Sequence, residues 1–161
     1  MKTRVLLTGG SGMVGRNFLE HPAAGEFEVL APGRRELDLF DAEAVESYLR
    51  ARRPDFVIHA AGRVGGIQAN VREPAGFLLD NLDMGRNVVA AARAAAVKRL
   101  LNIATSSMYP RSAPNPLRED MVLTGEMEPT NEGYGLAKAV VARLCTYISR
   151  EDSSYKYKTL I

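Results

Sequence analysis

Several residue types that carry specialised chemistry are scarce in this chain of 161 residues. Cys145 is the only cysteine, so neither an internal disulfide nor a cysteine-based zinc site can form. The 2 histidines, His21 and His59, are too few and too far apart for a metal site. No apolar run approaches the roughly 20 residues of a membrane span, and the N-terminus lacks the apolar region of a signal peptide. We therefore expect a cytoplasmic protein without metal or membrane span.

The chain also has little net charge of either sign. The formal net charge is only +2, and the basic residues are scattered, which argues against a nucleic-acid partner. Hydrophobic residues make up 46% and charged residues 25% of the chain, as is ordinary for a globular protein. The length suits one domain with a real core, and two domains would be cramped.

Strand-like and helix-like segments alternate along the chain. Short apolar runs predict strands at 4–8, 28–31, 56–59, 99–105 and 158–161. Helical patterns cover 13–19, 42–53, 74–96 and 131–149. Asp41 can cap the second helix, and Pro74 can open the third. The proline-containing segment 112–129 predicts a long ordered loop or a flap. This alternation predicts an α/β fold of the Rossmann type, a doubly wound parallel sheet with helices on both faces.

The predicted sheet is short for its class. A Rossmann sheet has about six strands, whereas this chain supplies about five, and the last strand runs into residue 161. We therefore expect residues 1–161 to form an incomplete NAD(P)-binding Rossmann domain, truncated before a C-terminal substrate domain.

A glycine-rich turn joins the first predicted strand to the first predicted helix. Gly9, Gly12 and Gly15 have the GxxGxxG spacing that lets the backbone turn tightly and approach a diphosphate closely. The following helix N-terminus presents free N–H groups to the anion. The strand–turn–helix context favours dinucleotide binding over a purely structural turn. The predicted cofactor contacts here are Gly9, Ser11, Gly12, Met13, Val14 and Gly15.

The end of the second predicted strand indicates which dinucleotide binds. An acidic residue there would bind the ribose of NAD, whereas this chain has Arg34 and Arg35. Guanidinium groups suit a 2′-phosphate, so NADP(H) is favoured over NAD. The alternatives are that both arginines are solvated, and that Glu36 binds the ribose of NAD. Asp38 could bind the adenine amino group, and Leu39 lies beside it.

A tyrosine and a lysine are four residues apart on the last predicted helix. Tyr134 and Lys138 therefore share one helix face. The ammonium should lower the pKa of the phenol, and the phenol can donate a proton to a carbonyl as hydride arrives. The alternative is an ordinary helix pair. Thr105 follows the fourth predicted strand, so its hydroxyl can bind a substrate carbonyl at the carboxyl ends of the strands.

Three segments resemble a known family more specifically than the glycine turn does. They are Ala60–Asn70 (AAGRVGGIQAN), Ser106–Pro110 (SSMYP) and Glu128–Tyr134 (EPTNEGY). They resemble the AAxxVGGIxAN, SSCIYP and EPTNEPY segments of the GDP-L-fucose synthases, the GDP-4-keto-6-deoxy-D-mannose epimerase/reductases among the extended short-chain dehydrogenase/reductases. The resemblance covers essentially the whole chain.

The resemblance implies a nucleotide-sugar oxidoreductase acting on a GDP-sugar. Epimerisation at C3 and C5 would precede reduction of the C4 ketone by NADPH. Tyr134 would be the proton donor, Lys138 its partner and Thr105 the carbonyl-binding hydroxyl. Ser107 stands where the family has a catalytic cysteine. A serine hydroxyl is a far poorer base than a thiolate, so the epimerase half is in doubt.

The remaining site predictions follow from the same segments. The predicted cofactor contacts include Ala60, Ala61, Gly62, Tyr134 and Lys138, of which Lys138 can hold the nicotinamide ribose. The predicted substrate contacts are Arg63, Val64, Gly65, Ser106 and Ser107. Arg63 could contact a sugar phosphate or be an exposed loop arginine. Asn81 could support the site or be an ordinary helix amide. His59 is expected to be structural or near the cofactor, and Cys145 a packed thiol.

Other functions stay open from the sequence. One alternative is a nucleotide-sugar C4 epimerase, or another 4-reductase, with bound NAD. Another is a cofactor-binding fragment without turnover. The family's counterpart of the long helix at 74–96 pairs across a dimer, so a homodimer is expected.

Overall fold

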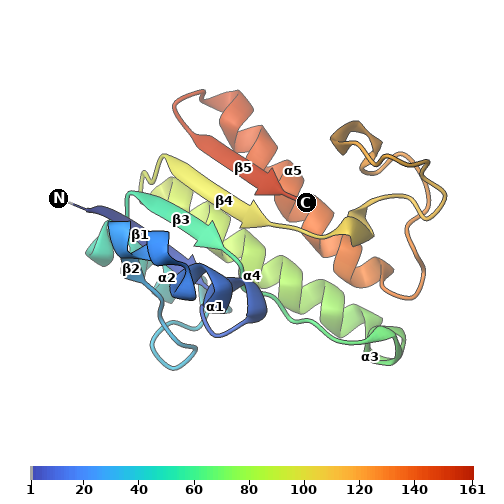
Figure 1. The fold of residues 1–161 in the computed structure, drawn as a ribbon, viewed down its shortest axis with the longest axis horizontal. Coiled ribbons are helices and arrows are strands. Elements are labelled where there is room, and N and C mark those ends of the chain that lie inside the picture. Colours follow the sequence, from blue (N-terminus) through green and yellow to red (C-terminus); the bar gives the residue numbers. More distant parts are fainter. Residues whose placement is uncertain (1) are drawn as a thin grey trace.

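The computed structural model describes residues 2–161, which form one five-stranded parallel sheet (Figure 1). The strand order is β2-β1-β3-β4-β5, and every neighbouring pair is parallel. The strands are β1 (Thr3–Thr8), β2 (Phe27–Leu30), β3 (Phe56–His59), β4 (Arg99–Ile103) and β5 (Lys156–Leu160). All five predicted strands are confirmed, with ends that differ from the prediction by at most two residues.

The helices also match the predicted pattern. They are α1 (Met13–Glu20), α2 (Ala42–Arg52), α3 (Ile67–Arg72), α4 (Pro74–Ala94) and α5 (Glu132–Glu151). Three 3₁₀ turns, η1 (Pro22–Glu26), η2 (Ser106–Met108) and η3 (Glu119–Met121), and the short helix α3 were not anticipated. Asp41 caps α2 by accepting from the Ala44 N–H at 3.0 Å, and Pro74 opens α4, as expected. The fourth strand ends two residues early because Thr105 caps η2.

The two faces of the sheet are covered by different helices. Leu6, Val57 and Leu100 point to one face and belong to the main core, to which α2, α4 and α5 contribute. Val5 and Ile58 point to the other face, in the cluster that includes Phe18 of α1. Figure 1 shows α4 and α5 behind the sheet. The predicted doubly wound arrangement, with helices on both faces, is therefore confirmed.

The chain between β4 and α5 is an ordered loop, one of the two expected possibilities. Val122 and Met127 are buried against Met108 and fix this loop to η2. Cys145 is 1% exposed in the main core, as expected for a packed thiol, and burial raises its pKa to about 12. No helix among residues 2–161 is long and apolar enough to cross a membrane.

Helices α4 and α5 approach each other closely at Gly85 of α4. A Cβ atom added to Gly85 would lie 2.5 Å from a methyl carbon of Val141 on α5. Val141 is fully buried, so it has no room to move. The glycine therefore sets the spacing of the two helices behind the sheet.

Replacing Gly85 by alanine should destabilise the fold. Overpacking against Val141 outweighs the gain in helix propensity, so we expect Gly85→Ala to lower the free energy of unfolding by about 1–2 kcal/mol. Chemical denaturation measures this. A matched control is Gly25→Ala, since nothing lies within 4 Å of a Cβ at Gly25. Equal midpoints for both variants would contradict the close crossing.

Candidate cofactor and active site

The glycine turn after β1 has the geometry that its sequence predicts. Gly9 has a φ of +75°, and an added Cβ would lie 2.6 Å from the Ala61 nitrogen. A Cβ at Gly15 would overlap the carbonyl oxygen of Gly9. Gly12 is the N-cap of α1 and has no side chain to cap it. The first-turn N–H groups of α1, including those of Met13 and Val14, therefore face outward for an anion.

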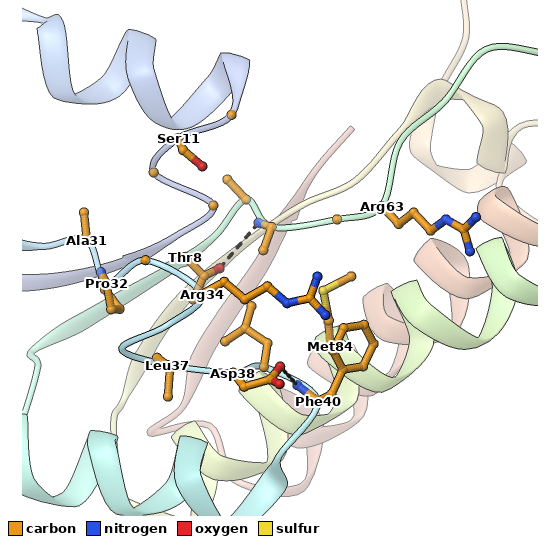
Figure 2. Close-up of a pocket in the computed structure, with 18 of the residues that line it drawn as sticks. Thr8, Ser11, Ala31, Pro32, Arg34, Leu37, Asp38, Phe40, Arg63 and Met84 are labelled. Carbon is orange, nitrogen blue, oxygen red and sulfur yellow. Dashed lines mark hydrogen bonds between the residues drawn. The ribbon is translucent and has the colours of Figure 1, made fainter. Parts of the chain in front are cut away.

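A cavity of about 620 Å³ lies beside this turn (Figure 2). It sits at the carboxyl ends of the strands, where β1 is flanked by β2 and β3, the place where dinucleotides bind in such sheets. Ten predicted site residues line it: Gly9, Ser11, Gly12, Arg34, Asp38, Leu39, Ala60, Ala61, Gly62 and Arg63. Nine other lining residues were not predicted as site residues: Thr8, Gly10, Ala31, Pro32, Gly33, Leu37, Phe40, Asp80 and Met84. Ala31 and Pro32 could have been found from their place after β2, whereas Asp80 and Met84 enter from α4 through the fold alone.

Some predicted residues do not line this cavity. Gly15 is buried under the turn, and Arg35 is exposed outside the cavity. Val64 is 75% exposed and, like Gly65, lies outside this cavity and outside the smaller hollow described below.

The two neighbouring arginines differ in their surroundings. Arg34 lines the cavity with its guanidinium 5.5 Å from the centre of the Phe40 ring (Figure 2). Glu36 points elsewhere, since it accepts a hydrogen bond from the Tyr48 hydroxyl at 3.2 Å and lies 3.9 Å from Arg52 on α2. The acidic alternative considered for NAD is thus turned away from the cavity.

Thr8 and His59 join the ends of β1 and β3 beneath the cavity. Thr8 Oγ1 and His59 Nδ1 share a buried hydrogen bond of 2.8 Å. Thr8 Oγ1 also accepts from the Ala61 N–H at 3.4 Å. Burial, with a contribution from the charge of Lys138, lowers the pKa of His59 to about 3. His59 is therefore neutral and structural, as expected, and it lies close to the cavity wall.

The loop after β3 is held by Asn81 of α4. Asn81 Oδ1 accepts from the Arg63 N–H at 2.9 Å, and Nδ2 donates to the Arg63 carbonyl at 3.0 Å. The Arg63 guanidinium bonds Glu73 and Asp80 and lies 4.5 Å from the centre of the Phe77 ring. Asn81 thus supports the site, whereas Arg63 is paired within the chain, and its pKa is raised by these carboxylates.

Lys138 connects α5 to the ends of two strands. Its buried Nζ donates to the carbonyl oxygens of Ile103 at 3.1 Å and Ala61 at 3.5 Å. Burial lowers its pKa to about 8, so the amine is mostly protonated at neutral pH. Nζ lies 6.0 Å from the centre of the Tyr134 ring. The two residues share a face, as predicted.

The expected direction of the Tyr134 pKa is wrong for this structure. Burial raises the pKa of the phenol above its ordinary value, and the neighbouring Thr105 hydroxyl acts in the opposite direction. Lys138 does not lower it, because its hydrogen bonds hold the ammonium at Ile103 and Ala61. Tyr134 therefore keeps its proton at neutral pH.

The turn η2 presses against the first turn of α5. A Cβ at Gly135 would lie 2.6 Å from the Ser107 carbonyl oxygen. This approach brings Thr105 and Ser107 next to Tyr134. A second hollow of about 370 Å³ opens beside them, lined by Ser106, Ser107, Tyr109, Pro110, Arg111, Ala113, Asn115, Leu117, Glu128 and Asn131.

The comparisons with known proteins agree with this arrangement. The model of the NAD dependent epimerase/dehydratase family matches residues 5–161. A GDP-L-colitose synthase from Yersinia pseudotuberculosis is 49% identical over 158 residues, which are 98% of this chain and 51% of that protein. A GDP-L-fucose synthase from Azorhizobium caulinodans is 48% identical over 98% of this chain and 50% of its own length. The chain thus spans about half the length of both relatives.

A solved structure is also similar. The structure of a GDP-D-glycero-L-gluco-heptose synthase from Campylobacter jejuni, determined in the presence of NADPH, superposes with a TM-score of 0.88. It is 28% identical, and the match covers 94% of this chain and 45% of that one.

The buried His59 should make stability fall in acid. Because its pKa lies below the ordinary 6.5, the unfolded chain takes up the proton first as the pH drops. Between about pH 6 and pH 4, His59 should cost about 1.4 kcal/mol of stability per pH unit. We expect His59→Asn to remove this part of the slope of stability against pH, which denaturation curves recorded at several pH values measure. The exposed His21→Gln is the control, and equal slopes for both variants would refute the assignment.

Proposed function

The chain belongs to the NAD dependent epimerase/dehydratase family, and from this premise we propose that it carries the cofactor-binding part of an NADPH-dependent reductase of 4-keto GDP-sugars. The observation that carries the proposal is the position of Lys138. Its hydrogen bonds to Ala61 and Ile103 tie the helix that bears Tyr134 to the wall of the glycine-turn cavity. The two relatives at 48–49% identity, named for GDP-sugar products, support the substrate class.

The residues of the larger cavity fit a dinucleotide. A side chain at position 9 would collide with Ala61, so only glycine allows the tight turn that opens the cavity. The N-terminus of α1 can receive the diphosphate. Arg34 would meet the 2′-phosphate, and Asp38 would meet the adenine amino group. When bound, NADPH supplies hydride to the C4 carbon of the sugar.

The chain's own residues complete the reduction. Tyr134 donates its proton to the C4 oxygen, and its raised pKa keeps that proton in place beforehand. Thr105 would support the same carbonyl oxygen through Ser107, since the Thr105 hydroxyl donates to Ser107 Oγ at 3.2 Å and leaves the Ser107 proton free for the ketone. Lys138 would hold the helix that bears Tyr134 in place through its hydrogen bonds to the carbonyl oxygens of Ile103 and Ala61.

Epimerisation at C3 and C5 is not part of this proposal. It requires removal of a proton from carbon, and Ser107 offers only a hydroxyl. Reduction of the C4 ketone needs no base at Ser107, whether or not the sugar has been epimerised beforehand.

We also infer a cytoplasmic homodimer formed through the outer faces of α4 and α5. Leu136, Val140 and Tyr147 share one face of α5 and are 39%, 44% and 47% exposed. Leu79 on α4 is 55% exposed. Exposed apolar residues aligned along a helix are typical of a helix-pairing surface.

Cofactor preference should depend on Arg34 far more than on Arg35. Loss of a charge-assisted contact to the 2′-phosphate should weaken NADPH binding about 10- to 100-fold in Arg34→Ala and leave NADH binding unchanged. Arg35→Ala is the matched control. Fluorescence titration of the chain with both cofactors measures this, and equal losses for NADPH and NADH would sink the assignment.

The proton-donor role predicts the behaviour of Tyr134→Phe in the full-length protein. Reduction of a 4-keto GDP-sugar should fall by at least about 100-fold, because the proton is lost while the ring remains. NADPH affinity should be unchanged. Tyr147→Phe removes an exposed hydroxyl from the same helix and should retain full turnover. Unchanged turnover in Tyr134→Phe would refute the proposed mechanism.

A further inference from the structure

We propose that Asn131 is a positioning residue that commits the Ser107 hydroxyl to donating a hydrogen bond to a ligand oxygen. The ligand would present a carbonyl or hydroxyl oxygen in the hollow beside η2. This inference rests on the proposed reductase function, because it concerns the same site. It assigns a role to Asn131, which the sequence analysis and the proposed mechanism leave without one.

Two donors meet at the oxygen of Ser107. Asn131 Nδ2 donates to Ser107 Oγ at 3.1 Å, and the Thr105 hydroxyl donates to the same atom at 3.2 Å. Thr105 Oγ1 in turn accepts from the Ser107 N–H at 3.2 Å. A serine hydroxyl has two acceptor lone pairs and one proton. With both lone pairs occupied, the remaining proton of Ser107 must point to another acceptor.

The hollow beside η2 is where that acceptor can bind. Ser107 and Asn131 both line it, together with Ser106 and Tyr109. A hydroxyl that already accepts two hydrogen bonds is a stronger donor through cooperativity. It is also unable to accept a proton. The arrangement therefore makes Ser107 a hydrogen-bond donor to the ligand and excludes it as a base.

The backbone position of Asn131 supports a functional role over a structural one. Asn131 is the N-cap of α5, where an asparagine side chain ordinarily accepts from an N–H of the first turn. Here the side chain makes no such bond and turns to Ser107. Its Oδ1 is buried without a hydrogen-bond partner among residues 2–161. The missing capping bond and the unpaired buried acceptor both cost stability. The contact between Asn131 and Ser107 is kept despite these costs.

A thiol probe tests the contact without any turnover. In Ser107→Cys, a donor at Asn131 stabilises the thiolate, so adding Asn131→Ala should raise the thiol pKa by about one unit and slow alkylation at pH 7 about ten-fold. Alkylation rates of the purified chain across pH give the pKa. Cys145 is buried and does not compete. Glu132→Ala, at the exposed neighbouring position, is the matched control. An unchanged alkylation profile in the Asn131 variant would overturn the proposal.

Asn131→Asp separates positioning from capping. Aspartate is a good N-cap, so Tm should be unchanged or higher, but its carboxylate accepts the Ser107 proton that the ligand needs. In the full-length protein, kcat should fall about ten-fold or more with NADPH affinity unchanged, and the same change should have no further effect in a Ser107→Ala background. Unchanged kcat would overturn the role. If the parent reduces no 4-keto GDP-sugar, the proposed function fails, while the alkylation assay still decides the role of Asn131.

Discussion

The hydrogen bonds of the buried Lys138 ammonium are the interaction on which the rest of the site depends. The ammonium bonds the carbonyl of Ile103 at the end of β4 and that of Ala61 after β3, so one side chain fixes α5 against two strand ends. An ammonium held by two carbonyls can remain buried because two of its three donors are satisfied. Its pKa of about 8 leaves it mostly charged at neutral pH. The same charge, together with burial, keeps His59 neutral beneath the cavity.

Three residues that line the cavities depart from the usual rules of local structure. Asp41 caps α2 with its side chain, whereas the N-caps of α1, α3, α4 and α5 make no side-chain capping bond. Two of these N-caps, Gly12 of α1 and Asn131 of α5, line a cavity. Gly9 adopts a left-handed conformation for the close approach of Ala61. Gly9, Gly12 and Asn131 all lie at cavity walls, which is where departures from local rules are expected if a ligand binds there.

The sequence predicts the elements well because periodicity, prolines and glycines are local signals. Pro74 marks the start of α4, and the Tyr134–Lys138 spacing places both residues on one face of α5. The hydrogen-bond partners of Lys138 could not be predicted from the sequence, because Ala61 and Ile103 come close to it only once the strands are arranged in the sheet. The pKa direction of Tyr134 was mistaken for the same reason, since burial and the carbonyl partners of Lys138 are tertiary properties.

The charged residues that line the larger cavity differ in whether they are paired, and the sequence alone does not reveal this difference. Arg63 and Asp80 both line it and bond each other, so their charges largely cancel. Asp38 accepts from the Phe40 N–H at 3.1 Å. Within residues 2–161, the Arg34 guanidinium faces an aromatic ring and bonds no carboxylate. A cation stacked on a ring keeps its hydrogen-bond donors free, and a guanidinium presents them in the plane that a phosphate needs. The proposed preference for a 2′-phosphate therefore depends on the side-chain direction of one arginine and not on the presence of two.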